Sequence, residues 1–283
     1  MKGEYLEASI VKDTDKMNII CNGSWGENKR YFLILLLYIF FPSDAYCYNE
    51  NIITISVGLT VQPYVIESNN SGFEIDIVKE ALLLEGYKAQ FIYQPLLRTK
   101  ISFKRGDVDA VMTIKPEYPE VRDAFVSKEY ITYHNFAITL RSQRFKIITI
   151  SDLNDKKVQA FQQAKLALGN EFEFMAKSNL TYLEQANQQN QIIMLFLKRA
   201  DALIIDKRIF RYHCNKLKQK QTNDKMFGNI MFNDPVVFHD LFESTSYHMA
   251  FKSEIVKDAF DRGLKKIRTS GRYERLIELY LVE

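Results

Sequence analysis

Hydrophobic positions after residue 50 follow two different periods. Short segments of alternating or continuous apolar residues predict strands at residues 53–57, 91–93, 108–112, 136–140, 158–161 and 202–205. Apolar residues spaced three or four apart predict helices at residues 72–84, 97–104, 165–177, 188–199 and 208–218. Strands and helices alternate, which is typical of βαβ units on parallel sheets. The pattern therefore predicts a mixed α/β protein.

One helix-to-strand sequence occurs twice. Residues 106–112 read GDVDAVM after a predicted helix, and residues 199–204 read RADALI after another. Because the same unit is found in both halves of the chain, we expect two lobes of similar architecture rather than one large sheet.

The N-terminal region has the order of a secretory signal peptide. A positive pair at residues 29–30 precedes eleven uninterrupted apolar residues at 31–41, and a small-residue step ends at Ala45. Eleven residues are too few to span a bilayer as a helix, and a buried core helix is the alternative. We therefore expect residues 1–45 to be an N-terminal extension and signal peptide, with cleavage after Ala45 and a periplasmic product. Met17 would be a more usual start.

Composition and charge narrow the class of partner. The chain has 283 residues, 47% hydrophobic and 26% charged, which excludes a disordered chain and a disulfide miniprotein. Its 38 basic and 35 acidic residues give a net charge of +3, without the clustered Lys and Arg that phosphate binding needs. We expect no nucleic-acid partner, and we expect the basic, glutamine-rich run at residues 216–225 to be a surface loop.

The cysteines carry no metal-binding signal. Cys21, Cys47 and Cys214 lie far apart without Cys-x-x-Cys spacing, and the four histidines are equally scattered. This spacing predicts no metal site and no cofactor. Export would place Cys47 and Cys214 in an oxidising compartment where they could pair. A free or a lipidated Cys47 is the alternative.

Six stretches in order carry a family resemblance. They are GLTVQPYVIE at residues 58–67, GFEIDIVKEALLLEGY at 72–87, FKRGDVDAVMTIKPE at 103–117, LNDKKVQAFQ at 153–162, RADALIID at 199–206 and FKSEIVKDAFDRGLKKIRTSGRYERLIELY at 251–280. Together they resemble the extracellular solute-binding proteins of family 3, the periplasmic receptors of polar amino-acid ABC importers. The resemblance runs from about residue 52 to the C-terminus.

The resemblance implies an α/β, two-lobe periplasmic binding protein fold of type II. Such a fold has two hinge strands and a ligand cleft between the lobes, at the carboxyl ends of the strands. Lobe 1 would comprise residues 51–132 and 241–283, and lobe 2 residues 133–240.

The resemblance also implies ligand contacts, each with a structural alternative. Asp206 would take a ligand's ammonium, or else cap the following helix. Thr113 would bind a ligand carboxylate, or pack at a strand end. Tyr64 would form a wall of the cleft or pack beneath it. Gln162, beside Gln163, would present an amide to the ligand or be solvated in a loop.

The chain departs from the family where an arginine should bind the ligand's α-carboxylate. Tyr118 stands at that position, and a buried charge left unpaired costs about 2–5 kcal/mol. Arg98 is the expected substitute and Arg122 the second, with a surface salt bridge as the alternative for both. Two aromatic rings, those of Phe73 and Phe161, are expected either at the cleft or in the core.

The leading interpretation is a monomeric periplasmic solute-binding protein without enzymatic activity. It would capture a small polar ligand, an amino acid or a related amine or organic acid, by hinge closure, and present it to ABC transporter membrane subunits or a membrane sensor. One alternative is a dehydratase acting on prephenate or arogenate through Lys115, Glu117 and Glu74. Another is a degenerate sensory or interaction module.

Overall fold

The computed structural model describes residues 51–223 and 232–281. The expected signal peptide with its cleavage after Ala45, the start at Met17 and the cysteines Cys21 and Cys47 lie outside these residues. In the described part of the chain, no helix is both long and apolar enough to cross a membrane.

The first sheet has six strands in the order β2-β1-β3-β11-β4, with β5 paired to β11. Strand β1 is parallel to β2 and β3, and β11 is antiparallel to β3, β4 and β5. The strands are β1 (Asn51–Val57), β2 (Tyr87–Tyr93), β3 (Ala110–Ile114), β4 (Phe125–Val126), β5 (Ile131–Tyr133) and β11 (Thr245–Phe251).

The second sheet has five strands in the order β10-β6-β9-β7-β8. Strand β7 is parallel to β8 and β9, whereas β6 is antiparallel to β9 and β10. The strands are β6 (Asn135–Leu140), β7 (Val158–Phe161), β8 (Leu183–Gln185), β9 (Ala202–Asp206) and β10 (Val236–His239).

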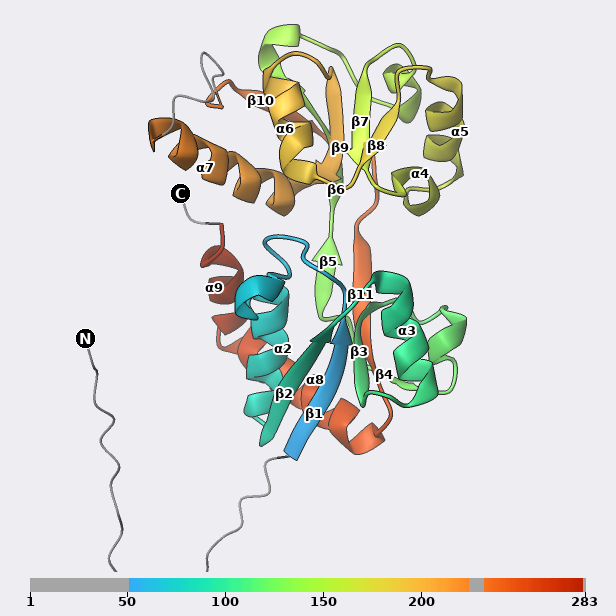
Figure 1. The fold of residues 1–283 in the computed structure, drawn as a ribbon, viewed down its shortest axis with the longest axis vertical. Helices are drawn as coiled ribbons and strands as arrows, with labels where there is room; N and C mark the ends of the chain where they lie inside the picture. The colour runs from blue at the N-terminus through green and yellow to red at the C-terminus, as the bar shows by residue number, and fades with distance from the viewer. Residues whose placement is uncertain (1–50, 224–231, 282–283) are drawn as a thin grey trace, which may run out of the picture. The chain divides into compact units, whose positions relative to one another are not determined.

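We call the first sheet with its helices lobe 1 and the second with its helices lobe 2 (Figure 1). The helices of lobe 1 are α2 (Phe73–Leu83), α3 (Leu96–Arg105), α8 (Glu254–Thr269) and α9 (Arg272–Glu278). Those of lobe 2 are α4 (Ala164–Ala167), α5 (Asn170–Ser178), α6 (Gln188–Phe196) and α7 (Lys207–Asn223). Short 3-10 turns are η1 (Glu67–Asn69), η2 (Pro119–Val121), η3 (Arg141–Gln143) and η4 (Ile150–Leu153).

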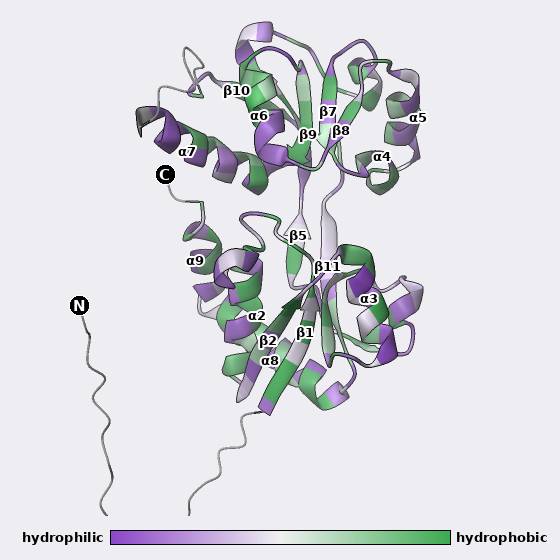
Figure 2. Cartoon of the chain, viewed as in Figure 1, coloured by the Kyte–Doolittle hydropathy of each residue, from purple (hydrophilic) through white to green (hydrophobic). Residues whose placement is uncertain are grey.

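Strand β3 is buried on both faces. Ala110 and Met112 belong to the hydrophobic cluster that also contains the apolar residues of α2, α8 and α9. Val111 belongs to a different cluster, with Phe103 of α3. Three helices therefore cover one face of the first sheet and α3 covers the other. Figure 2 shows the hydrophobic residues concentrated along the strands of both sheets.

Strand β9 repeats this arrangement in lobe 2. Leu203 and Ile205 pack in the cluster that contains α6 and α7, whereas Ala202 and Ile204 pack in the cluster that contains α4 and α5. All five residues of β9 are buried, as expected for a strand covered on both faces.

The repeated sequence stretch forms a repeated hydrogen bond. Asp109 precedes β3, and its Oδ2 accepts from the Thr54 amide of β1 at 2.8 Å. Asp201 precedes β9, and its Oδ2 accepts from the Lys157 amide directly before β7 at 2.9 Å. In both lobes an aspartate directly before one parallel strand therefore binds an amide in, or directly before, the neighbouring parallel strand.

The described chain passes between the two sheets at two places. His134 is the single residue between β5 and β6, and residues 240–244 separate β10 from β11. The His134 Nε2 lies 2.9 Å from Asp240 Oδ1 and 3.0 Å from the Phe242 carbonyl oxygen, so the two crossings lie side by side (Figure 1).

Most predicted elements are present, with differences in length, register and continuity. The strand predicted at residues 91–93 begins earlier, at Tyr87, and the helix predicted at 188–199 ends at Phe196. The helix predicted at residues 165–177 is wrong, because Gly169 has a φ of +91° and separates α4 from α5. The predicted strand at 108–112 is shifted to Ala110–Ile114. The predicted loop at 216–225 is wrong for its first part, since α7 continues to Asn223.

Candidate functional site

A buried carboxylate, Glu74, lies in the first turn of α2. Its side chain is fully buried and accepts hydrogen bonds from the hydroxyl groups of Thr113 at 2.7 Å, Tyr133 at 3.0 Å and Tyr130. Burial raises the pKa of Glu74, and the three hydroxyl donors oppose that rise. Because the Thr113 hydroxyl already donates to Glu74, it has no proton left for a ligand carboxylate in this arrangement.

Thr113 has an unusual backbone at the end of β3. Its φ is +56°, which costs a β-branched residue about 1–3 kcal/mol. The hydrogen bond of its hydroxyl to Glu74 and that of its amide to the Tyr130 hydroxyl, at 3.2 Å, offset part of this cost. The position that the family resemblance assigns to the ligand is therefore held in place by the protein's own groups.

The loop between β1 and α2 covers the N-terminus of α2. The amides of Phe73 and Glu74 donate to the carbonyl oxygens of Pro63 and Tyr64, both at 3.1 Å. Gly72 makes this approach possible, because a Cβ there would lie 2.2 Å from the Tyr64 oxygen and its φ is +116°. Amides that often bind anions at a helix N-terminus are thus already bonded.

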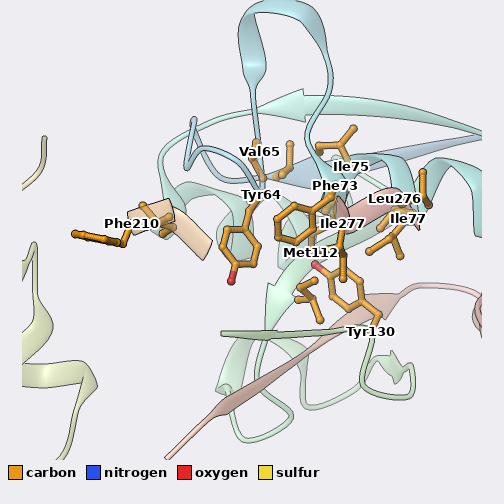
Figure 3. Packing of buried hydrophobic residues seen from close by; sticks show 14 of the residues in the cluster. Tyr64, Val65, Phe73, Ile75, Ile77, Met112, Tyr130, Phe210, Leu276 and Ile277 are labelled. Atoms are coloured by element: carbon orange, nitrogen blue, oxygen red, sulfur yellow. The ribbon is translucent and has the colours of Figure 1, made fainter. Parts of the chain in front are cut away.

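Tyr64 and Phe73 belong to one aromatic cluster. Both are fully buried, with ring centroids 4.4 Å apart, and Tyr64 also stacks on Tyr133 at 3.9 Å. Figure 3 shows Tyr64, Phe73 and Tyr130 gathered in the core of lobe 1. The Tyr64 hydroxyl lies near the Asp206 carboxylate and the Arg208 guanidinium of lobe 2. Burial and then the nearby Asp206 carboxylate raise the pKa of Tyr64.

Asp206 makes the hydrogen bonds of a helix cap. It ends β9 and is 2% exposed. Its Oδ1 accepts from the amides of Arg208 at 2.8 Å and Ile209 at 3.1 Å, and its Oδ2 accepts from the His134 amide at 2.8 Å. Burial raises its pKa, although these amides oppose the rise. Asp206 thus joins α7 to the first crossing, which is the structural alternative expected for it.

Arg208 was not among the residues expected at the site. It was counted in a helix with a solvated basic face, but it is half-buried. Its Nη1 donates to the Thr132 carbonyl oxygen of β5 at 2.9 Å, and its guanidinium carbon lies 5.8 Å from the Phe73 ring centroid. Arg208 therefore links lobe 2 to lobe 1. The first turn of α7 has no acidic residue, and a cation at a helix N-terminus is unfavourable because it opposes the helix dipole. An arginine at this position in the sequence could therefore have indicated a specific role.

Arg98, the expected substitute for the missing arginine, and Tyr118, which stands at its position, lie apart from Glu74 and Arg208. Arg98 is exposed in the first turn of α3, and Tyr118 packs beside the cluster of α3 with the Lys100 ammonium 4.1 Å from its ring centroid. Within the described residues, neither forms a hydrogen bond or ion pair with Glu74 or Arg208.

The loop after β7 is also bonded internally. Phe161 packs at the edge of the α4 and α5 cluster, and Gln162 is exposed. The Glu184 carboxylate accepts from the amides of Gln163 at 2.7 Å and Lys165 at 3.0 Å. Although burial raises its pKa, these bonds and one from a tyrosine hydroxyl hold the pKa of Glu184 below its ordinary value. Glu184 therefore binds backbone amides of this loop, whereas the ligand contact expected of the Gln162 side-chain amide stays a prediction.

An open groove of about 620 Å³ lies between the lobes. Residues 115–117, 245–246 and His248 line it from lobe 1, Ile150 and residues 167–171 from lobe 2, and residues 241–244 from the second crossing. Lys115, Glu117 and Glu171 thus face one space, whereas the eight residues expected at the site do not line it. Among the described residues, no group of His, Cys, Asp and Glu could hold a metal ion.

Comparisons with known proteins agree on the architecture. No family model matches the chain. The histidine-binding periplasmic protein of Escherichia coli K12 is 25% identical over 260 residues, which cover 89% of this chain and 96% of that protein. An ancestral arginine-binding protein bound to arginine has a TM-score of 0.56 at 19% identity, covering 82% and 98% of the two chains. An ancestral amino-acid-binding protein, a precursor of cyclohexadienyl dehydratase, has a TM-score of 0.55 at 22% identity, covering 82% and 96%.

The chain therefore has the two-lobe fold of periplasmic binding proteins, and the expected fold class is confirmed. It also has weak sequence homology to histidine-binding periplasmic proteins, which fits a divergent member of the family 3 solute-binding proteins. The exact lobe limits and the ligand-contacting residues stay predictions.

Proposed function

We propose that this protein is a periplasmic solute-binding protein that captures an amino acid between its lobes and delivers it to the membrane subunits of an ABC importer. The observation that carries the proposal is a groove lined by both lobes and by a crossing. The sequence supports it, because the chain is similar over 89% of its length to a histidine-binding periplasmic protein. Rotation about the crossings would bury a ligand in this groove.

The charges in the groove favour a basic amino acid. Lys115 supplies a cation for a carboxylate, and Glu117 and Glu171 supply anions for ammonium or side-chain cations. The similar proteins named for histidine and arginine support the same ligand class. The carboxylate role lost at Tyr118 would then pass to Lys115 rather than to Arg98.

The experiment is a thermal-shift panel of the twenty common amino acids, amines and organic acids on the chain from residue 46 onward, followed by calorimetry. We expect a basic amino acid to raise Tm, because a ligand at about 100 times its Kd stabilises the folded state by about 2.7 kcal/mol. If no compound of the panel raises Tm, the proposal is contradicted.

Two glutamates on α5 provide a matched pair for the groove. Glu171 lines the groove, whereas Glu173 pairs with Lys177 at 2.8 Å and does not line it. Glu171→Gln is expected to weaken binding of the basic amino acid about tenfold or more, and Glu173→Gln to leave it unchanged. Equal effects of the two changes would place the ligand elsewhere.

An enzyme remains the second candidate, because one structural neighbour is a precursor of cyclohexadienyl dehydratase. The relatives are otherwise binding proteins, which supports a protein without catalysis. Lys115 and Glu117 line the groove, but the third residue expected for acid/base chemistry, Glu74, is bonded to hydroxyl groups elsewhere. Product formation from prephenate that is lost in Lys115→Ala would favour the enzyme.

A further inference from the structure

The groove and the Arg208 contacts lie on opposite sides of the two crossings. The groove is lined by the segment that joins α4 to α5, and these helices pack on one face of the second sheet. Arg208 lies in the first turn of α7, which packs on the other face, and its guanidinium reaches Phe73 at the start of α2. In Figure 1, α7, α2 and α9 accordingly lie on one side of the crossings, and α3, α4 and α5 on the other.

The Arg208 contacts join the two lobes directly. The hydrogen bond to the Thr132 carbonyl oxygen, at 2.9 Å, and the position of the guanidinium over the Phe73 ring both connect a lobe 2 side chain to lobe 1. A hydrogen bond from a charged donor and a cation–π contact are each individually stabilising. We call this pair of contacts the interlobe latch.

The base of Arg208 is held rigidly at the crossings. Asp206 binds the Arg208 amide and the His134 amide with its two oxygens. The His134 ring in turn bonds Asp240 and the Phe242 carbonyl oxygen of the second crossing. Arg208 belongs to lobe 2, whereas Thr132 and Phe73 belong to lobe 1, so we expect a rotation of one lobe against the other to change these contacts.

We propose that Arg208 acts as a latch that holds the groove open, and that the ligand binds against the free energy of this latch. A rotation that brings the groove walls together separates the contacts on the far side of the crossings. Arg208 is then a positioning residue that lowers affinity without touching the ligand, since a protein that must leave a favoured state binds more weakly. The binding part of this inference rests on the proposed function, whereas the position of the lobes does not.

The first test needs no ligand. Spin labels at Lys104→Cys in α3 and Leu180→Cys after α5, in a Cys47→Ser background, report the distance between the lobes on the groove side. Both native side chains are exposed. With Arg208→Gln, we expect the ligand-free distance distribution to shift toward shorter distances. An unchanged distribution overturns the latch, whatever the fate of the proposed function.

The second test is affinity for the amino acid found in the panel. Arg208→Gln is expected to lower Kd about 3-fold to 10-fold, the equivalent of one net hydrogen bond, and Arg208→Lys to have a smaller effect because it keeps the charge. Arg211→Gln, an exposed position on the same helix, is the matched control and is expected to leave Kd unchanged. A Kd raised by Arg208→Gln would show that Arg208 binds the ligand and would overturn the latch.

Circular dichroism and denaturant unfolding of each variant separate these outcomes from misfolding. If the wild-type chain binds no member of the panel, the proposed function fails while the distance measurement still decides the latch. If the wild-type chain binds and Arg208→Gln changes neither Kd nor distance, only the latch fails.

Discussion

The two lobes have similar hydrogen bonds where their parallel strands begin and different ones where these strands end. At the starts of the strands, Asp109 in lobe 1 and Asp201 in lobe 2 accept the amide of the neighbouring parallel strand at nearly the same distance. At the ends, lobe 1 has the hydroxyl of Thr113 bonded to a buried glutamate, whereas lobe 2 has Asp206 bonded to backbone amides. The difference lies at the edge where open α/β sheets bind ligands.

This difference shows how each lobe satisfies a buried carboxylate. In lobe 1, the partners of Glu74 are side-chain hydroxyl groups from three separate strand or loop positions. In lobe 2, the partners of Asp206 are amides of its own helix and of the adjacent crossing. Lobe 1 therefore depends on side-chain packing, whereas lobe 2 depends on local backbone geometry.

The largest effect is expected from a substitution that disrupts the helix packing of lobe 1. A Cβ on Gly263 of α8 would lie 1.9 Å from the Ala81 carbonyl oxygen of α2, and backbone atoms cannot move aside as a side chain can. Gly263→Ala should lower the free energy of unfolding by about 3 kcal/mol or more, measured by denaturant unfolding. Gly169→Ala in lobe 2, where a Cβ meets open space, should cost only about 1 kcal/mol for its positive φ. A larger loss from Gly169→Ala would contradict the comparison.

The second effect tests the buried carboxylate of lobe 1. Glu74→Ala leaves the hydroxyl groups of Thr113, Tyr130 and Tyr133 without their shared acceptor, so we expect a loss of about 2 kcal/mol in the free energy of unfolding. Glu74→Gln, which keeps an acceptor and the side-chain volume, should lose less. If the two variants lose equal free energy, the hydroxyl bonds do not stabilise lobe 1.

The same glutamate predicts a pH dependence. Its pKa in the folded state is raised above its ordinary value by burial, so the folded protein binds more protons than the unfolded chain between these two pKa values. Stability from this group is then present below the ordinary pKa of glutamate and is lost as pH rises through the folded pKa. Unfolding measured across this range should show a flatter profile for Glu74→Gln. The raised pKa of Asp206 has the same sign and leaves a residual slope.

The smallest effect tests the equivalence of the lobes. Asp109→Ala and Asp201→Ala each remove a carboxylate that binds a neighbouring strand amide. Each should lower the free energy of unfolding by about 1 kcal/mol. Each carboxylate also accepts one side-chain hydrogen bond, from the Thr54 hydroxyl at 2.6 Å in lobe 1 and from the Gln143 side-chain amide at 3.2 Å in lobe 2, so we expect similar losses. Asp107→Ala, which precedes the same strand and accepts no side-chain hydrogen bond among the described residues, is the control. A difference of several kcal/mol between the lobes would show that the repeat is not equivalent.

Much of the fold could be predicted from the sequence, because strand and helix periods are local. Strands β1, β6, β7 and β9 were predicted within one or two residues at each end. The break at Gly169 was missed because a glycine inside an apolar helical pattern is compatible with a continuous helix. Of the expected site residues, Tyr64, Phe73, Thr113 and Asp206 lie near one another, but the groove is lined by others.

The sequence by itself determined the alternation of strands and helices, because the hydrophobic period is a property of neighbouring residues. It also determined the repeated helix-to-strand stretch that indicates two lobes. Only the tertiary structure decided which partner each polar group takes. A threonine hydroxyl can donate to a ligand or to a glutamate, and packing chose Glu74 for Thr113. An arginine at a helix start can face water or another lobe, and packing directed Arg208 toward Thr132 and Phe73. Partners that lie far apart in the chain meet only when the sheets, helices and crossings are in place.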